Sequence, residues 1–163
     1  MAGRAARAPQ GGGDGGGAEL KITVLALGRN RDADLERLIQ GYVARCPWPV
    51  RIDELVPRKG ESEAARLGRA LPDGAAVTAL DERGELATSE DLAARIGGWR
   101  DEGRDLAFLI GGADGLDDAT RARADWRLAL GRLTWPHLMV RLLLVEQLYR
   151  ASTILAGHPY HRS

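Results

Sequence analysis

Short apolar segments alternate along this chain with segments of helical spacing, and this alternation constrains the fold more than any other feature. The first apolar segment, LKITVLALG, shows no polar alternation and ends at a glycine. Such a strand is typical of a parallel sheet that is covered on both faces. We expect strands at residues 20–28, 50–56, 75–81, 105–112 and 126–130. We expect helices near residues 32–45, 62–71, 88–103, 116–124 and 136–156. The sequence therefore predicts an α/β fold, a parallel sheet with flanking helices.

The last expected helix, at residues 136–156, is the longest and has a proline in its first turn. Its apolar positions lie on more sides than one surface helix needs. Because so small a domain should not bury all of them, we expect the remaining apolar face to pack against a second copy. A symmetric homodimer is the commonest arrangement of that kind.

Composition limits the number of domains and the class of protein. Residues 1–18 are mostly Gly, Ala and Arg, which bury too little surface to offset the entropy of ordering, so we expect a disordered tail before one domain at residues 19–163. No apolar run approaches the roughly 20 residues of a membrane span. The single cysteine, Cys46, excludes an internal disulfide and a thiolate zinc site, and it fits a cytoplasmic protein.

Charge is unevenly distributed, although the net charge is zero. Residues 19–118 contain 14 basic and 20 acidic side chains, whereas residues 119–163 contain 7 arginines and only two acids. Arginine is suited to phosphate contact and to stacking on bases, so the C-terminal quarter is a candidate RNA-binding region. A solvated helix face with scattered arginines is equally consistent with this pattern.

Ligands in an open parallel sheet bind at the carboxyl ends of the strands. The loops expected there read LDERG, IGGADG and LGRLTWPH, at residues 80–84, 110–115 and 130–137. The glycines of the second loop would let the backbone approach a ligand closely, although a glycine-rich turn that binds nothing is as common. The chain has no P-loop, no zinc spacing and no G-x-G-x-x-G, which argues against an NTPase, a zinc enzyme and a dinucleotide-binding protein.

Four motifs near the C-terminus are more specific: TWPH, VEQLYRA, ILAG and HPYHR, which follow LDERG and FLIGG in order. With these motifs the chain resembles the RlmH family of SPOUT methyltransferases, over residues 20–162. The resemblance implies a C-terminal deep trefoil knot, the α/β-knot of this superfamily, and a homodimer. It also implies S-adenosyl-L-methionine as cofactor and methylation of N3 of a pseudouridine in 23S rRNA. No metal is implied.

The resemblance also implies which residues form the sites. Cofactor binding is expected, mostly through backbone groups, at Leu80, Gly111, Leu130, Gly131, Arg132, Leu133, Thr134 and Trp135. Many relatives have smaller polar or aliphatic residues at positions 131, 132 and 135, so the side-chain contacts of these three are open. RNA contacts are expected from Tyr160, His161, Arg162 and Arg150, with Tyr160 stacking on a base and Arg162 holding phosphate. The first three could instead reach the active site of the partner subunit.

Methyl transfer to an imide nitrogen depends on positioning, and a base or a stabiliser of the developing anion would help it. The candidates are His137, His158 and His161, with Arg141 and Arg150 as stabilisers of charge. His137 follows a proline at a helix start, so it also fits a capping or packing role. Near-neutral charge favours an enzyme that docks on the assembled 70S ribosome over one that grips naked RNA. The alternatives are a SPOUT enzyme for a transfer RNA base and a non-catalytic ribosome-binding dimer.

Overall fold

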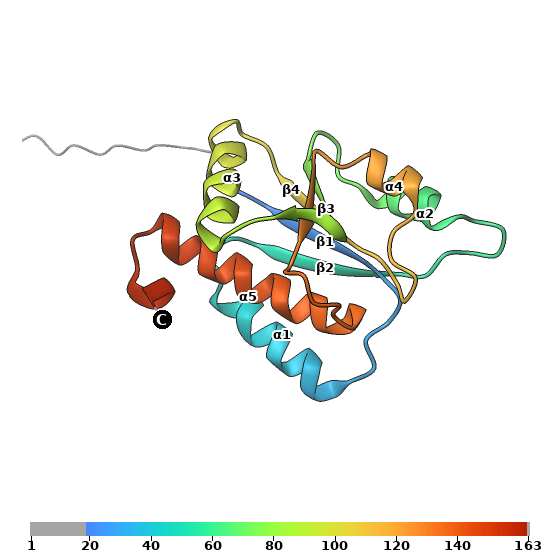
Figure 1. Cartoon of the computed structure of the whole chain (residues 1–163), viewed down its shortest axis with the longest axis horizontal. Coiled ribbons are helices and arrows are strands. Elements are labelled where there is room, and N and C mark those ends of the chain that lie inside the picture. Colours follow the sequence, from blue (N-terminus) through green and yellow to red (C-terminus); the bar gives the residue numbers. More distant parts are fainter. Residues whose placement is uncertain (1–18, 163) are drawn as a thin grey trace, which may run out of the picture.

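The structure is a computed structural model that describes the backbone of residues 19–162 and the side chains of residues 19–160 (Figure 1). The tail expected at residues 1–18 lies outside the described residues. The strands are β1 (Ile22–Leu27), β2 (Val50–Leu55), β3 (Ala76–Leu86), β4 (Leu106–Ile110) and β5 (Trp126–Ala129). The helices are α1 (Ala33–Arg45), α2 (Glu63–Ala70), α3 (Ser89–Asp101), α4 (Asp118–Ala122) and α5 (His137–Leu155), followed by the 3-10 turn η1 (Pro159–Arg162). These bounds confirm the predicted order of strands and helices.

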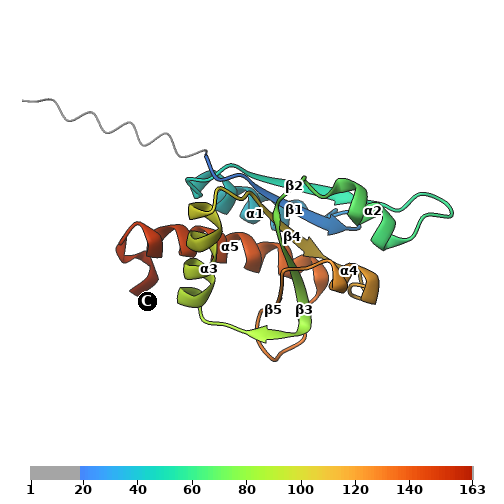
Figure 2. The ribbon, with the colours of Figure 1, turned by 90° about the horizontal axis from the view of Figure 1, so that it is seen from above.

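The strands form one sheet in the order β2-β1-β4-β3-β5, and every pair of neighbours is parallel. Successive side chains of a strand point to opposite faces. In β1, Ile22, Val24 and Ala26 pack with α3 and α5, whereas Leu25 and Leu27 pack with the α2 side. Helices α1, α3 and α5 thus cover one face, and α2 and α4 cover the other (Figure 2). The predicted parallel α/β fold with flanking helices is confirmed.

Local sequence explains where the helices begin. Asp32 caps α1 by accepting hydrogen bonds from the backbone N–H groups of Asp34 and Leu35, both at 3.0 Å. Thr88 and Asp91 form a reciprocal capping box at the start of α3. Each cap satisfies backbone donors that a helix start leaves without a partner.

Strand β3 corrects the sequence prediction, which ended this strand at residue 81 and placed a loop after it. The strand continues to Leu86, and its pairing with β5 shifts register between Leu80 and Glu85. Gly84 permits this, because a Cβ there would lie 2.8 Å from the backbone carbonyl of Arg127. The polar residues of LDERG therefore form a bend within a strand that stays next to β5, and this bend faces the carboxyl ends of the sheet.

Helix α5 uses several of its apolar sides within the chain. Leu144, Leu148 and Ala151 join the core cluster with α3 and the sheet, and Val145 packs with Leu35 and Ile39 of α1. Figure 1 shows α5 running between α1 and α3. This packing accounts for much of the apolar character that the sequence shows, and it brings the first turn of α5 to the ends of β3 and β5.

Candidate functional site

A cavity of about 270 Å³ lies where the three loops after Leu80, Ile110 and Ala129 converge at the carboxyl ends of β3, β4 and β5. This is the edge of the sheet at which a parallel α/β fold binds ligands. All of the residues that line the cavity lie at or after Leu80 in the chain. The first strand, the second strand and their helices support the cavity without forming its wall.

Seven of the eight residues expected to bind the cofactor line this cavity: Leu80, Gly111, Leu130, Gly131, Leu133, Thr134 and Trp135. The eighth, Arg132, is exposed and does not line it. His137, a catalytic candidate, also lines the cavity, at the first position of α5 and with a half-buried side chain. The structure therefore brings together residues that are 57 positions apart in the sequence, from Leu80 to His137.

The glycine loop forms one wall as a tight backbone turn. The N–H of Gly115 donates to the carbonyl oxygen of Gly112 over 3.0 Å, and Gly115 has a φ of 76°, which favours glycine. A Cβ at Gly111 would collide with the backbone of Gly115 and Leu116. Glycine at position 111 thus lets the turn close on itself and places main-chain groups along the cavity.

The loop before α5 forms the opposite wall. The indole Nε1 of Trp135 donates to the carbonyl oxygen of Leu130 over 3.2 Å, which holds the two ends of this loop together. Leu133 and Trp135 are the more exposed members, with 73% and 40% of their surface accessible. A second cavity of about 300 Å³ shares Leu130, Gly131 and Trp135 with the first, and it continues toward α3 and Leu143 of α5.

Charged side chains at the cavity were not singled out from the sequence. Asp81, Glu82 and Arg83 line it from the bend of β3, and Asp114 lines it from the glycine loop. Their positions lie inside the LDERG and IGGADG loops, so the carboxyl-end rule was the signal that could have found them. Arg121 also lines the cavity, but it belongs to α4 and no motif marks it.

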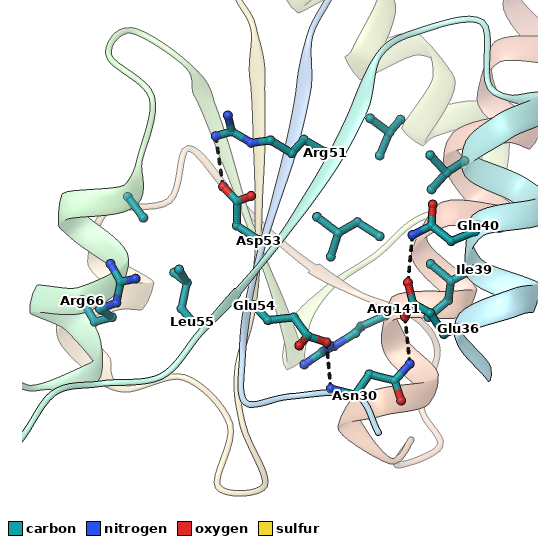
Figure 3. Close-up of a pocket in the computed structure, with 14 residues that line it drawn as sticks. Asn30, Glu36, Ile39, Gln40, Arg51, Asp53, Glu54, Leu55, Arg66 and Arg141 are labelled. Atoms are coloured by element: carbon teal, nitrogen blue, oxygen red, sulfur yellow. Dashed lines mark hydrogen bonds and ion pairs between the residues drawn. The ribbon is translucent and has the colours of Figure 1, made fainter. Parts of the chain in front are cut away.

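Arg141 lies away from this cavity, although it is only four positions after His137. Its side chain is buried, and it donates to Glu54 over 2.6 Å and to the carbonyl oxygens of Leu27 and Gly28 over 3.3 and 3.1 Å. Figure 3 shows Arg141 and Glu54 in a separate, polar cleft of about 930 Å³ beside β2 and α1. The structure thus places Arg141 outside the cavity that His137 lines and gives it bonds that tie α5 to β1 and β2.

The C-terminal segment folds back onto α5. The ring of Tyr160 lies 4.7 Å from that of Tyr149, centroid to centroid, and Arg150 lies over it at 5.0 Å. The Tyr160 hydroxyl donates to Glu146 over 3.2 Å, and Arg150 donates to the same carboxylate over 2.6 Å. Tyr160 and Arg150, expected at the RNA, therefore contact each other and Glu146. The side chains of His161 and Arg162 lie outside the described residues.

The surroundings of Tyr160 also change its acidity. Burial, hydrogen bonding with Tyr42 and the negative charge of Glu146 raise the pKa of Tyr160 to about 12. Its hydroxyl is therefore a hydrogen-bond donor throughout the neutral range. The pKa of Arg150 is raised as well, chiefly by its hydrogen bond with Glu146. The closed arrangement, in which the C-terminal turn is attached to α5, therefore holds Tyr160 as the neutral phenol and Arg150 as the charged guanidinium.

Residues 19–160 contain no group of three or more His, Cys, Asp or Glu side chains placed to hold a metal ion. Within the described chain, no helix combines the length and apolar character needed to cross a bilayer.

Comparisons with known proteins agree with this geometry. A family model described as predicted SPOUT methyltransferase matches residues 20–161. The chain is 49% identical to Ribosomal RNA large subunit methyltransferase H of Roseobacter denitrificans, over 88% of this chain and 100% of that protein. It is 47% identical to the protein of the same name from Paracoccus denitrificans, over 88% of this chain and 99% of the relative.

Solved structures share the fold at low sequence identity. A probable methylase family protein from Haemophilus influenzae is similar with a TM-score of 0.57 and 10% identity, over 87% of this chain and 70% of the other. TrmJ from Z. mobilis is similar with a TM-score of 0.53 and 13% identity, over 82% of this chain and 70% of that one. The likeness in fold and the extended match in sequence lead to one conclusion: the chain belongs to the SPOUT methyltransferases, within the RlmH family of large-subunit ribosomal RNA methyltransferases.

Proposed function

We propose that this protein methylates N3 of a pseudouridine in 23S rRNA with S-adenosyl-L-methionine, as a homodimer on the assembled 70S ribosome. The observation that carries the proposal is the convergence of seven expected cofactor residues on one cavity at the carboxyl ends of parallel strands. Relatives that match 88% of the chain are named Ribosomal RNA large subunit methyltransferase H. Family, fold and cavity thus support one activity.

The residues present fit S-adenosylmethionine. The main cavity has about 270 Å³ and adjoins a second one of about 300 Å³, whereas small-molecule sites generally measure about 300–1,000 Å³. Leu80 and Leu130 offer apolar contacts to a purine ring, and the turn at Gly111 offers main-chain donors and acceptors for its polar edge. When bound, the cofactor supplies an electrophilic methyl group carried by a sulfonium.

The protein's own residues then act on the acceptor base. We assign to His137, on the cavity wall, the acceptance of the proton that the imide nitrogen loses as it gains the methyl group. We keep His161 as a second candidate for this proton and Arg162 as a phosphate contact. Arg141 has no part in this scheme, because its guanidinium is buried and bonded to Glu54.

Dimerisation is supported by apolar surface beside the cavity. Leu133 and Trp135 are exposed, and Leu143 of α5 lines the adjoining cavity. A second copy that covers this surface would exclude water from the site and bring another basic C-terminal segment near it. We also propose the trefoil knot of the superfamily for the segment that leads from β5 into α5. Sedimentation of the purified protein measures the dimer directly.

The substrate is tested by locating the methyl group. Mass analysis of rRNA from a strain that lacks the gene should show one unmethylated pseudouridine in 23S rRNA, and purified protein should restore it on 70S ribosomes. Isolated 23S rRNA is the control, and it should be a poorer substrate. A methyl group missing from transfer RNA instead would identify a different acceptor, and binding to ribosomes without transfer would indicate a non-catalytic module.

A further inference from the structure

The two walls of the cavity that follow β3 and β4 are held together beyond the sheet by an ion pair. The β3–β4 ladder ends at the pair Leu80–Ile110, so sheet hydrogen bonds hold the walls no further. Beyond that point the Nε of Arg121, on α4, donates to Oδ2 of Asp81 over 2.8 Å. Both side chains line the cavity.

Asp81 serves both sides of this junction with one carboxylate. Its Oδ1 accepts a hydrogen bond from the backbone N–H of Arg83 over 3.1 Å, inside the bend of β3. Its Oδ2 accepts the bond from Arg121. One orientation of the Asp81 carboxylate therefore both stabilises the bend of β3 and reaches Arg121 on α4. The position of the β3 bend thus depends on the position of α4.

Arg121 is held equally firmly on its own side. Its Nη1 donates to Asp118 over 2.9 Å, one turn earlier in α4. Its Nη2 lies 3.9 Å from the point that a Cβ at Gly115 would occupy, so the guanidinium lies beside the glycine turn. Arg121 therefore joins the bend of β3 to the side of the cavity on which the turn at Gly111 lies.

Burial makes this pair sensitive to substitution. The side chain of Asp81 is 3% exposed and that of Arg121 is 16% exposed. Removal of one partner leaves the other as a charge with poor access to water, which is much costlier than loss of a surface pair. Burial acts to lower the pKa of Arg121, but Asp81 and Asp118 outweigh it and raise that pKa, so the guanidinium stays charged.

We propose that Asp81 and Arg121 are positioning residues that fix the separation of the β3 bend and the glycine turn, and thereby set the affinity for the cofactor. This inference rests on the proposed function. Neither residue is assigned to the reacting atoms. Loss of the pair should therefore raise the KM for S-adenosylmethionine while kcat at saturating cofactor changes much less, because only the shape of the binding wall is altered.

The chain offers a comparable but more exposed pair at the other end of the sheet. Arg104 donates to Asp125 over 3.2 Å, and Asp125 also accepts from the backbone N–H of Val77 over 2.8 Å. Like Asp81, Asp125 thus joins an arginine to the backbone of β3, but neither residue of this second pair lines the cavity. Substitutions here test whether loss of such a junction affects cofactor binding at a distance.

The experiment measures the Kd for S-adenosylhomocysteine by calorimetry, together with the melting temperature, for the full-length protein. The variants are Asp81→Asn, Arg121→Met, their double variant, Arg121→Lys and Asp125→Asn. We expect Asp81→Asn and Arg121→Met each to weaken binding about tenfold or more. The double variant should lose little beyond either single one, because the two residues act as a pair. Arg121→Lys, which keeps the charge, should recover part of the affinity.

The Asp125→Asn control decides the outcome, together with the KM for S-adenosylmethionine and the kcat of methylation measured for the same variants. Asp125→Asn should lower the melting temperature while its Kd stays within about twofold of the wild type. Wild-type affinity in folded Asp81→Asn and Arg121→Met, or losses that simply add in the double variant, would overturn the inference. An equal loss in Asp125→Asn would overturn it too, since a general loosening would then be the cause. Absence of binding by the wild-type protein would instead refute the proposed cofactor itself.

Discussion

The indole nitrogen of Trp135 donates a hydrogen bond to the carbonyl oxygen of Leu130, five positions earlier, and so closes the loop that forms one wall of the cavity. Trp135 also lines both the main cavity and the adjoining one. One side chain thus determines the shape of the loop and forms part of the surface between the two cavities. Several consequences for binding and stability can be measured.

Substitution of Trp135 by Phe keeps an aromatic ring and removes the donor. A hydrogen bond of this kind contributes about 0.5–1.5 kcal/mol, so we expect Trp135→Phe to weaken S-adenosylhomocysteine binding by up to roughly tenfold. Calorimetry measures the Kd. Leu38→Ala is the control, because it removes an exposed apolar side chain outside both cavities and should leave the Kd unchanged. An unchanged Kd in Trp135→Phe would show that the loop keeps its shape without this bond.

Gly111→Ala should abolish cofactor binding, because its Cβ would collide with the backbone of Gly115 and Leu116 and force the turn open. Gly112→Ala is the matched control: its Cβ would meet only the Leu27 side chain, at 4.0 Å. We expect the control to bind S-adenosylhomocysteine nearly as the wild type does. Equal affinity in both variants would contradict the structure of the turn.

His137→Gln should lower kcat by about a hundredfold or more if its imidazole accepts the proton of the acceptor base, with little change in the Kd for S-adenosylhomocysteine. The measurement is single-turnover methylation of 70S ribosomes across a range of pH. His158→Gln is the control, because His158 is exposed and lies outside the cavity. Retention of full activity in His137→Gln would assign this residue to packing at the start of α5.

Breaking the Arg141–Glu54 pair should lower the stability of the protein without changing its affinity for the cofactor. Arg141 is buried, and Glu54→Ala leaves its charge without a partner carboxylate, at a cost of about 3–5 kcal/mol in the free energy of unfolding. Arg51→Ala removes an exposed arginine from the same cleft and should change stability by less than about 1 kcal/mol. Urea denaturation measures both. A stable Glu54→Ala protein that no longer binds S-adenosylhomocysteine would show that the Arg141–Glu54 pair contributes to cofactor binding.

Tyr160 should give stability a distinctive dependence on alkaline pH. Its pKa is raised from 10.0 to about 12, so the folded protein favours the neutral phenol more than the unfolded chain does. This contribution is fully present below about pH 10 and is lost as the pH rises through about 12. Tyr160→Phe should lack that part of the decline. Denaturation curves at several pH values compare the two proteins, and parallel declines would contradict the closed C-terminal turn.

Much of the fold could be predicted from the sequence, because buried parallel strands are uninterrupted apolar segments and glycines or prolines follow the helices. The extension of β3 could not, since residues 82–85 read ERGE, three charged residues around a glycine, and resemble a loop. They form a strand because Gly84 allows the backbone to cross β5 closely, a contact between residues distant in the sequence. Local pattern does not contain that information.

The candidate site could likewise be predicted only in part. The positions of the three loops follow from the parallel sheet, and the resemblance selected seven residues that line the cavity. The sequence did not indicate a role for Arg121 at the site, because its partner, Asp81, lies 40 positions away. Arg141 was expected to stabilise charge during the reaction, but the rotation of α5 directs it to Glu54. A helix sequence shows which residues share a face, and only tertiary packing shows what that face meets.

Because every residue that lines the cavity lies at or after Leu80, the chain divides its tasks between two stretches of sequence. Residues 19–79 line no part of this cavity and support β4 and α5, a task that many combinations of apolar side chains can perform. Natural variation can therefore accumulate there and reshape the outer surface while the chemistry of the second half stays constant. The loops that line the cavity can thus keep their geometry while other surfaces of the molecule change.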